Sequence, residues 1–98
     1  MTDRPELSIV IVSFNTEAMT RECLESIFLN APDLDFEIIV VDNASTDGSP
    51  EMIEDSFPDV ILIRNIDNRG FAAANNQAFA IARGRYILLL NSDTIILD

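Results

Sequence analysis

The chain has 98 residues, an apolar fraction of 48% and a net charge of -11, and its 6 basic residues are all arginine. This length allows one domain with a modest core, and the apolar fraction excludes a disordered chain. Nucleic acid is excluded as a partner class, because a phosphate backbone would be repelled by so acidic a protein.

The N-terminus and the single cysteine narrow the class of protein further. Residues 1–5 have neither the basic nor the apolar region of a secretory signal, and no apolar run approaches the roughly 20 residues of a membrane helix. We therefore expect a cytoplasmic protein, which as part of a longer chain could lie at the inner face of a membrane. Cys23 has no second cysteine or histidine to pair with, which favours a small core residue.

The first predicted elements are a strand, a helix and a second strand. Leu7–Phe14 and Phe36–Val41 are nearly continuous runs of branched apolar residues, which are typical of parallel strands covered on both faces. Between them, apolar side chains recur at helical spacing, and Thr16 is the expected helix cap. These side chains belong to Met19, Cys23, Leu24, Ile27 and Phe28.

The second helix and the third strand follow. Ser49 and Pro50 are a capping residue and a proline at the first helical position, and Pro58 ends the helix. Val60–Arg64 is another short run of branched residues and predicts the third strand.

The last predicted elements are a helix over residues 70–83 and a strand over Tyr86–Leu90. The helix is alanine-rich, and Gly84 stands where a C-terminal glycine cap is expected. Alternating strands and helices with right-handed crossovers predict an α/β fold: a three-layer α/β/α domain with a mainly parallel sheet of four strands. Ligands of such sheets bind beyond the carboxyl ends of the strands.

Polar loops follow all four predicted strands. They are Ser13–Thr16, Asp42–Gly48, Asn65–Gly70 and Asn91–Asp93. Any one of them could be an ordinary turn, and for Ser45 and Asp47 helix capping is the favoured interpretation. Four such loops on one edge favour a ligand site, in which Gly70 would allow close backbone approach and Arg69 would supply a positive charge.

Three common nucleotide-binding architectures do not match. The chain has only 3 glycines, so no G-x-G-x-x-G follows the first strand, and without lysine it has no P-loop. A phosphoacceptor receiver domain would place paired acids after the first strand and a lysine later in the chain, and neither is present.

Four successive segments carry a family resemblance. IVIVSFN (9–15), IIVVDNASTDGS (38–49), NRGFAAANNQA (68–78) and YILLLNSDT (86–94) resemble, in order and spacing, the motifs of family 2 glycosyltransferases, nearest the rhamnosyltransferase-like branch. The resemblance implies an inverting enzyme of the GT-A fold, with strand order 3-2-1-4. Residues 1–98 would be the nucleotide-sugar-binding N-terminal part. The acceptor-binding part and the general base are expected after Asp98, which would leave this piece inactive alone.

The same resemblance implies the site residues. The nucleotide-binding set is Ser13, Phe14, Asn15, Asp42, Asn43, Asn68, Arg69, Gly70, Asn91 and Ser92. Asp42 would accept a hydrogen bond from the base, and Asp93 would be the ligand of Mn²⁺ or Mg²⁺. A divalent cation neutralises the charge that develops on a departing nucleoside diphosphate.

The resemblance places Asn91–Asp93 at the Asp-x-Asp motif of the family, and Asn91 stands where that motif has its first aspartate. An amide supplies no charge, so we expect weak metal affinity without nucleotide. The alternative is that Asn91–Asp93 is only a turn that leaves a buried strand.

The leading interpretation is the donor-binding half of a glycosyltransferase of cell-surface polysaccharide biosynthesis. It would use a UDP- or dTDP-sugar and transfer a hexose or deoxyhexose to a glycan, lipid-linked or protein acceptor. Two alternatives stay open: a nucleotidyltransferase, and a non-catalytic interaction module with a degenerate nucleotide site. An apolar edge strand also predicts a homodimer, through the fourth strand or the tail at residues 95–97.

Overall fold

A computed structural model describes residues 4–30, 33 and 35–94. Seven elements alternate along the chain: β1 (Leu7–Ser13), α1 (Glu17–Asn30), β2 (Phe36–Asp42), α2 (Ser49–Ser56), β3 (Ile61–Arg64), α3 (Phe71–Ile81) and β4 (Tyr86–Asn91). All strand pairs are parallel, in the order β3-β2-β1-β4. The predicted fold class and strand order are confirmed.

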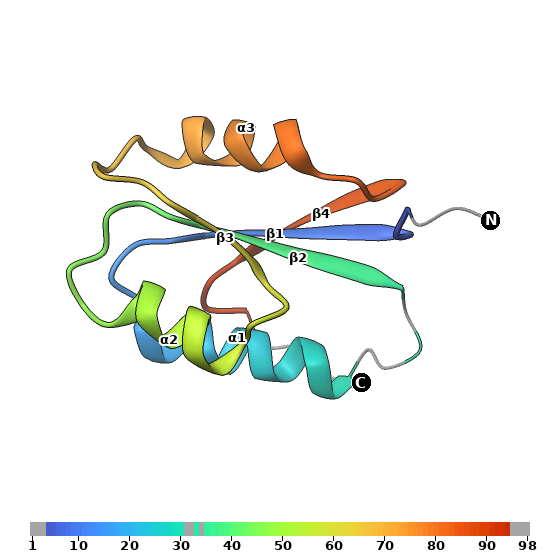
Figure 1. Cartoon of the computed structure of the whole chain (residues 1–98), viewed down its shortest axis with the longest axis horizontal. Coiled ribbons are helices and arrows are strands. Elements are labelled where there is room, and N and C mark those ends of the chain that lie inside the picture. The colour runs from blue at the N-terminus through green and yellow to red at the C-terminus, as the bar shows by residue number, and fades with distance from the viewer. Residues whose placement is uncertain (1–3, 31–32, 34, 95–98) are drawn as a thin grey trace.

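Helices cover both faces of the sheet, α3 on one and α1 with α2 on the other (Figure 1). Neighbouring residues of a strand point to opposite faces, so one apolar run serves two layers. In β1, Ile9 and Ile11 pack toward α1, whereas Val10 packs toward Ala74 and Ala78 of α3. Cys23 is fully buried in the α1 layer, which confirms it as a core residue.

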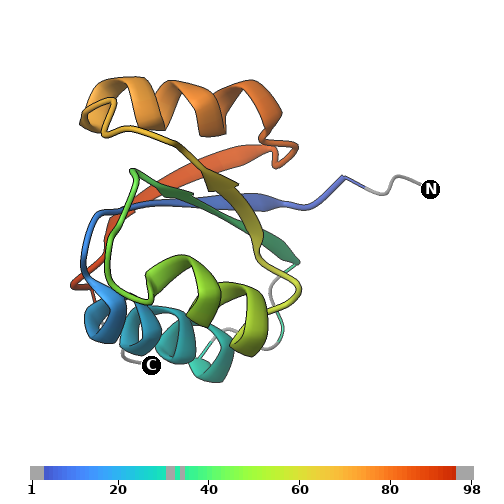
Figure 2. The same cartoon turned by 60° about the vertical axis from the view of Figure 1, so that its left-hand side comes forward.

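Two strands form the edges of the sheet in the described part of the chain. β3 is held to α2 by Arg64, whose guanidinium lies 2.9 Å from Glu51 and 3.2 Å from Glu54. β4 pairs with β1; it begins near the end of α3 and ends near the start of α1 (Figure 2). The side chains of its first four residues, Tyr86–Leu89, are between 40% and 61% exposed.

The predicted role of Gly84 is wrong. α3 already ends at Ile81, and its C-cap Ala82 has extended backbone angles, φ -65 and ψ 133. A Cβ atom on Gly84 would lie 2.4 Å from the backbone nitrogen of Ser8. The Gly84 N–H donates to the Ser8 hydroxyl at 2.8 Å. Glycine is needed here because the chain crosses closely over the start of β1 on its way into β4.

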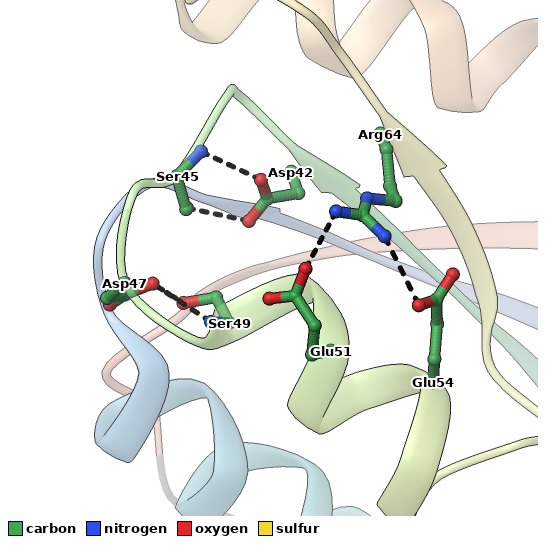
Figure 3. Close-up of polar contacts among 7 residues, drawn as sticks. All are labelled: Asp42, Ser45, Asp47, Ser49, Glu51, Glu54 and Arg64. Carbon is green, nitrogen blue, oxygen red and sulfur yellow. Dashed lines mark hydrogen bonds and ion pairs between the residues drawn. The ribbon is translucent and has the colours of Figure 1, made fainter.

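The start of α2 also differs from the prediction. Gly48 is the N-cap residue, and Ser49 lies within the helix as its first residue. The Ser49 hydroxyl donates to Asp47 at 2.5 Å, and the Ser49 N–H donates to the same carboxylate at 2.9 Å (Figure 3). Asp47 is therefore the acceptor at this helix start. Within the described residues, no helix is long and apolar enough to cross a membrane.

Candidate functional site

A cavity of about 480 Å³ opens at the carboxyl edge of the sheet. Its walls come from the ends of β1, β2 and β4 and from the starts of α1 and α3, and they comprise Val12, Phe14, Thr16, Met19, Asn43, Asn68, Gly70, Phe71, Asn91, Ser92 and Asp93. The chain leaves β1 toward the α1 face but reaches β4 from the α3 face. The cavity thus lies where the strand order reverses, the usual ligand position in such sheets.

Most of the candidate residues line this cavity. Those that do are Phe14, Asn43, Asn68, Gly70, Asn91, Ser92 and Asp93; Ser13, Asn15, Asp42 and Arg69 do not. Sequence reasoning missed Val12, Thr16, Met19 and Phe71 as lining residues. Met19 fits the core-facing helical pattern, yet it is 44% exposed because it sits in the first turn of α1, beside the cavity.

Asp42 shapes the turn that follows β2. It is 2% exposed, and its carboxylate accepts the Ser45 N–H at 2.9 Å and the Ser45 hydroxyl at 2.7 Å (Figure 3). Between them Ala44 has a φ of 65, in the left-handed region that a β-carbon disfavours. Ser45 is therefore part of a turn, and its predicted role as a helix cap is wrong.

Asn15 ties the loop after β1 to the loop after β2. Its backbone has a φ of 53, its N–H donates to the Ser45 hydroxyl at 2.8 Å, and its side-chain carbonyl accepts the Thr46 N–H at 2.7 Å. Ser13 is fully buried, and its hydroxyl lies 3.2 Å from that of Thr16. These two residues fix the loop after β1, next to the cavity-lining Phe14.

Asp47 strengthens the same connection. Burial acts to raise the pKa of its carboxyl, but hydrogen bonds from Ser49 and from the Glu17 N–H outweigh it and lower the pKa. The Glu17 bond spans 3.2 Å and satisfies the first N–H of α1. Asp47 thus serves both helix starts, as its predicted capping role requires.

Asn43, which is 2% exposed, anchors the loop before α3. The Asn43 amide donates to the Gly70 carbonyl at 3.2 Å and accepts the Arg69 N–H at 3.4 Å. Gly70 has φ 84 and ψ 169, a conformation that is essentially restricted to glycine. The Arg69 guanidinium faces Asp67 at 3.2 Å, and both side chains are largely exposed.

The turn at Asn91–Asp93 forms the cavity wall at the end of β4. The Asn91 carbonyl accepts the Thr94 N–H at 3.0 Å, and Asn91 and Asp93 are exposed toward the cavity mouth. Cys23 lies beneath this turn, with its sulfur 4.0 Å from the Asn91 carbonyl. Burial, together with the Asp93 charge, raises the Cys23 pKa to about 11.

A metal ion would find oxygen ligands here, but few charges. The described residues contain no group of three or more His, Cys, Asp or Glu side chains that could hold a metal ion. Asp93 offers one carboxylate at the cavity, beside the Asn91 amide and the Ser92 hydroxyl. This set fits a hard cation that takes most of its other ligands from phosphates and water, as Mg²⁺ often does.

The chain is similar to known glycosyltransferases along its length. It is 38% identical over 96 residues to the poly(ribitol-phosphate) beta-glucosyltransferase of Bacillus spizizenii, covering 93% of this chain and 15% of that protein. It is also 38% identical over 100 residues to an uncharacterized glycosyltransferase of Methanocaldococcus jannaschii, covering 97% of this chain and 34% of that one. The chain thus spans about a third or less of these relatives.

Solved structures show the same fold. The mannosyltransferase PcManGT of Pyrobaculum calidifontis, in complex with GDP-Man and Mn²⁺, matches with a TM-score of 0.85 and 29% identity over 99% of this chain and 30% of that one. S. aureus TarS 1-349 in complex with UDP matches with a TM-score of 0.80 and 27% identity, over 90% of this chain and 27% of that one. The family model "Glycosyl transferase family 2" matches residues 8–98. The chain therefore belongs to glycosyltransferase family 2.

Proposed function

We propose that this chain is the nucleotide-sugar-binding part of an inverting glycosyltransferase. The observation that carries the proposal is the convergence of three strand ends and the α3 start on one cavity, with the Asp93 carboxylate at its wall. The bound nucleotides named for PcManGT and TarS, GDP-Man and UDP, support a nucleotide-diphosphate sugar as the ligand class. The family assignment leaves the nucleotidyltransferase alternative without support.

The cavity walls suggest how a donor would lie. Phe14 is 46% exposed and offers an aromatic face to a planar base, and Asn43 offers a polar edge to the base or ribose. Asn68 and Gly70 stand at the opposite wall, where the start of α3 favours negative charge. Asp42 is 2% exposed and does not line the cavity, so it can accept a hydrogen bond from the base only if the loop around it moves.

Asp93 is the residue we assign to the metal. Mn²⁺ or Mg²⁺ at this carboxylate would neutralise the diphosphate as the sugar leaves, in a chain whose own net charge is -11. With an uncharged Asn91 beside it, the site is expected to hold the metal well only together with nucleotide. Asn91 and Ser92 would then orient metal-bound water or ribose.

The acceptor chemistry lies outside these residues. Inversion needs a general base that deprotonates the acceptor hydroxyl as it attacks the anomeric carbon. The chain spans 15% and 34% of the two relatives described above, so we propose that a further segment supplies the base. The acceptor would be a glycan, a lipid-linked glycan or a protein, and the sugar a hexose or deoxyhexose.

Nucleotide selectivity tests this function. Calorimetric titration of UDP, dTDP and GDP in the presence of Mn²⁺ should show binding of at least one diphosphate, and uridine without phosphate should bind far more weakly. The reason is that most of the affinity is assigned to the metal-bridged diphosphate. Failure of all three diphosphates to bind at millimolar concentration would contradict the function proposed for this chain and favour the interaction module.

We also propose that the isolated chain forms a dimer through β4. One side of this strand has no partner strand within the described residues, and Tyr86–Leu89 present apolar side chains on both faces. Such an edge pairs readily with a second copy. The alternative route, through residues 95–97, lies outside the described residues.

The oligomeric state tests this pairing. Solution scattering at high micromolar concentration should report a dimer, and Leu88→Lys should convert it to a monomer because charge on an edge strand opposes pairing. Ile66→Lys is the matched control, since Ile66 is 93% exposed after β3 at the opposite edge. A wild-type monomer would refute the proposal.

A further inference from the structure

Three amide side chains form a chain of hydrogen bonds behind the cavity. The Asn65 side-chain nitrogen donates to the Asn43 carbonyl oxygen at 2.9 Å and to the Gln77 carbonyl oxygen at 2.8 Å. The Gln77 nitrogen donates back to the Asn65 oxygen at 2.9 Å. Asn43 and Asn65 are 2% and 8% exposed, and Gln77 is half-buried on α3.

Two backbone groups set the direction of every bond in this chain. The Arg69 N–H can only donate and the Gly70 carbonyl can only accept, so Asn43 must turn its oxygen to the first and its nitrogen to the second. Asn65 must then present its nitrogen to Asn43. That leaves the Asn65 oxygen for Gln77, whose own amide can complete the pair in only one orientation.

This chain of hydrogen bonds connects Gln77 to the Arg69–Gly70 backbone at the cavity mouth. Asn43 and Gly70 line the cavity, whereas Gln77 does not. We propose that Gln77 is a positioning residue of the nucleotide site: acting through Asn65 and Asn43, it holds the Arg69–Gly70 backbone where the donor approaches. The proposal rests on the function proposed above, and it adds a residue that touches neither the donor nor the metal.

The substitutions Gln77→Leu and Gln77→Glu separate positioning from general stability. Leucine removes both bonds to Asn65, so roughly tenfold weaker binding of UDP with Mn²⁺ is expected. An ionised carboxylate can accept from Asn65 but cannot donate to it, whereas a protonated carboxyl can do both. The affinity deficit of Gln77→Glu relative to wild type should therefore shrink at least twofold from pH 8 to pH 5, while that of Gln77→Leu stays constant.

Asn76→Asp is the matched control for added charge. Asn76 is the exposed neighbour of Gln77 on α3, so this variant places the same charge on the same helix without reaching Asn65. Its affinity should stay within twofold of wild type at both pH values. The charged residues of the adjoining loop, Asp67 and Arg69, pair with each other and are the same in all variants.

Amide hydrogen exchange provides the readout that needs no ligand. The Arg69 N–H is held by the Asn43 side chain, whereas the Asn43 N–H is held by the Ser13 carbonyl at 2.9 Å, between the ends of β2 and β1. Gln77→Leu should speed exchange at Arg69 about tenfold and leave exchange at Asn43 unchanged. A merely structural role would raise both rates together.

The outcomes distinguish this inference from the proposed function. If wild type binds UDP and Gln77→Leu binds it equally well, the positioning role of Gln77 is wrong while the donor site stands. If wild type binds no diphosphate, both proposals fall, whatever the exchange rates show. A Gln77→Glu deficit that does not change with pH would also overturn the inference, because the direction of the bonds would then be immaterial.

Discussion

At the scale of single residues, Cys23 gives the chain a specific response to alkaline pH. Its pKa rises from the ordinary 9.0 to about 11, through burial and then through the charge of Asp93. The unfolded thiol therefore ionises first, so the folded chain binds more protons between pH 9 and 11. Stability is complete below pH 9 and should fall by about 2 kcal/mol as the pH rises to 11.

Urea unfolding between pH 8 and 11 measures this loss, with Cys23→Ala as the reference. The variant should be less stable at pH 8 because it leaves a small cavity, but its stability should be flatter across the window. Parallel pH profiles would contradict a buried, neutral thiol.

The two aspartates at strand ends illustrate what sequence reasoning could and could not predict at this scale. Asp42 and Asp93 both stand at the ends of apolar runs, and both were candidates for the site. Only Asp93 lines the cavity; Asp42 is 2% exposed and its carboxylate accepts two hydrogen bonds from Ser45. A serine three residues after an aspartate is a signal for such a turn, and it could have been used.

At the scale of the elements, the connection from α3 to β4 depends on Gly84. A Cβ atom there would meet the backbone nitrogen of Ser8 at 2.4 Å, which neither β1 nor the entering chain can relieve without moving. Gly84→Ala should therefore lower the free energy of unfolding by about 2–3 kcal/mol. Thermal or urea unfolding measures the change.

Gly48→Ala is the matched control for that substitution. A Cβ on Gly48 would meet only the carboxylate of Glu17, at 3.0 Å, and that flexible side chain can turn away. A loss of about 1 kcal/mol or less is expected, which comes from alanine being a weaker N-cap residue than glycine. Equal losses in the two variants would show that close approach to β1 is not what Gly84 provides.

The elements themselves were predictable, and their ends were less so. Unbroken runs of branched apolar residues identify all four strands. β1 and β2 are covered on both faces, and β3 and β4 each lie beside one of them. Gly84 was misassigned because a glycine after a helical pattern usually caps it. The contact that requires this glycine involves Ser8, which lies far away in the sequence and gives no local signal.

At the scale of the whole molecule, the cavity results from topology. Chain segments that contact one another across the site, such as Asn15 with Ser45 and Asn43 with Gly70, are brought together only by the parallel order β3-β2-β1-β4. The sequence predicts that polar loops share one edge, but the strand order came from family resemblance. The side-chain bonds between loops could not be predicted, since turn residues have many available partners.

Because the whole chain is acidic, the central question is whether nucleotide binding depends on a metal ion. A net charge of -11 opposes a nucleoside diphosphate, and the donor site as proposed overcomes this through a divalent cation at Asp93. Binding should therefore depend on the cation and on that one carboxylate.

The most direct test is calorimetric titration of UDP, with and without Mn²⁺, into wild type, Asp93→Ala and Asp55→Ala. Asp55 is an exposed aspartate on α2 that does not line the cavity, so its variant makes the same change in charge. Wild type and Asp55→Ala should bind UDP at least tenfold more tightly with Mn²⁺, and Asp93→Ala should lose that dependence. Equal metal dependence in all three proteins would contradict the assignment of Asp93, and with it the account of the site.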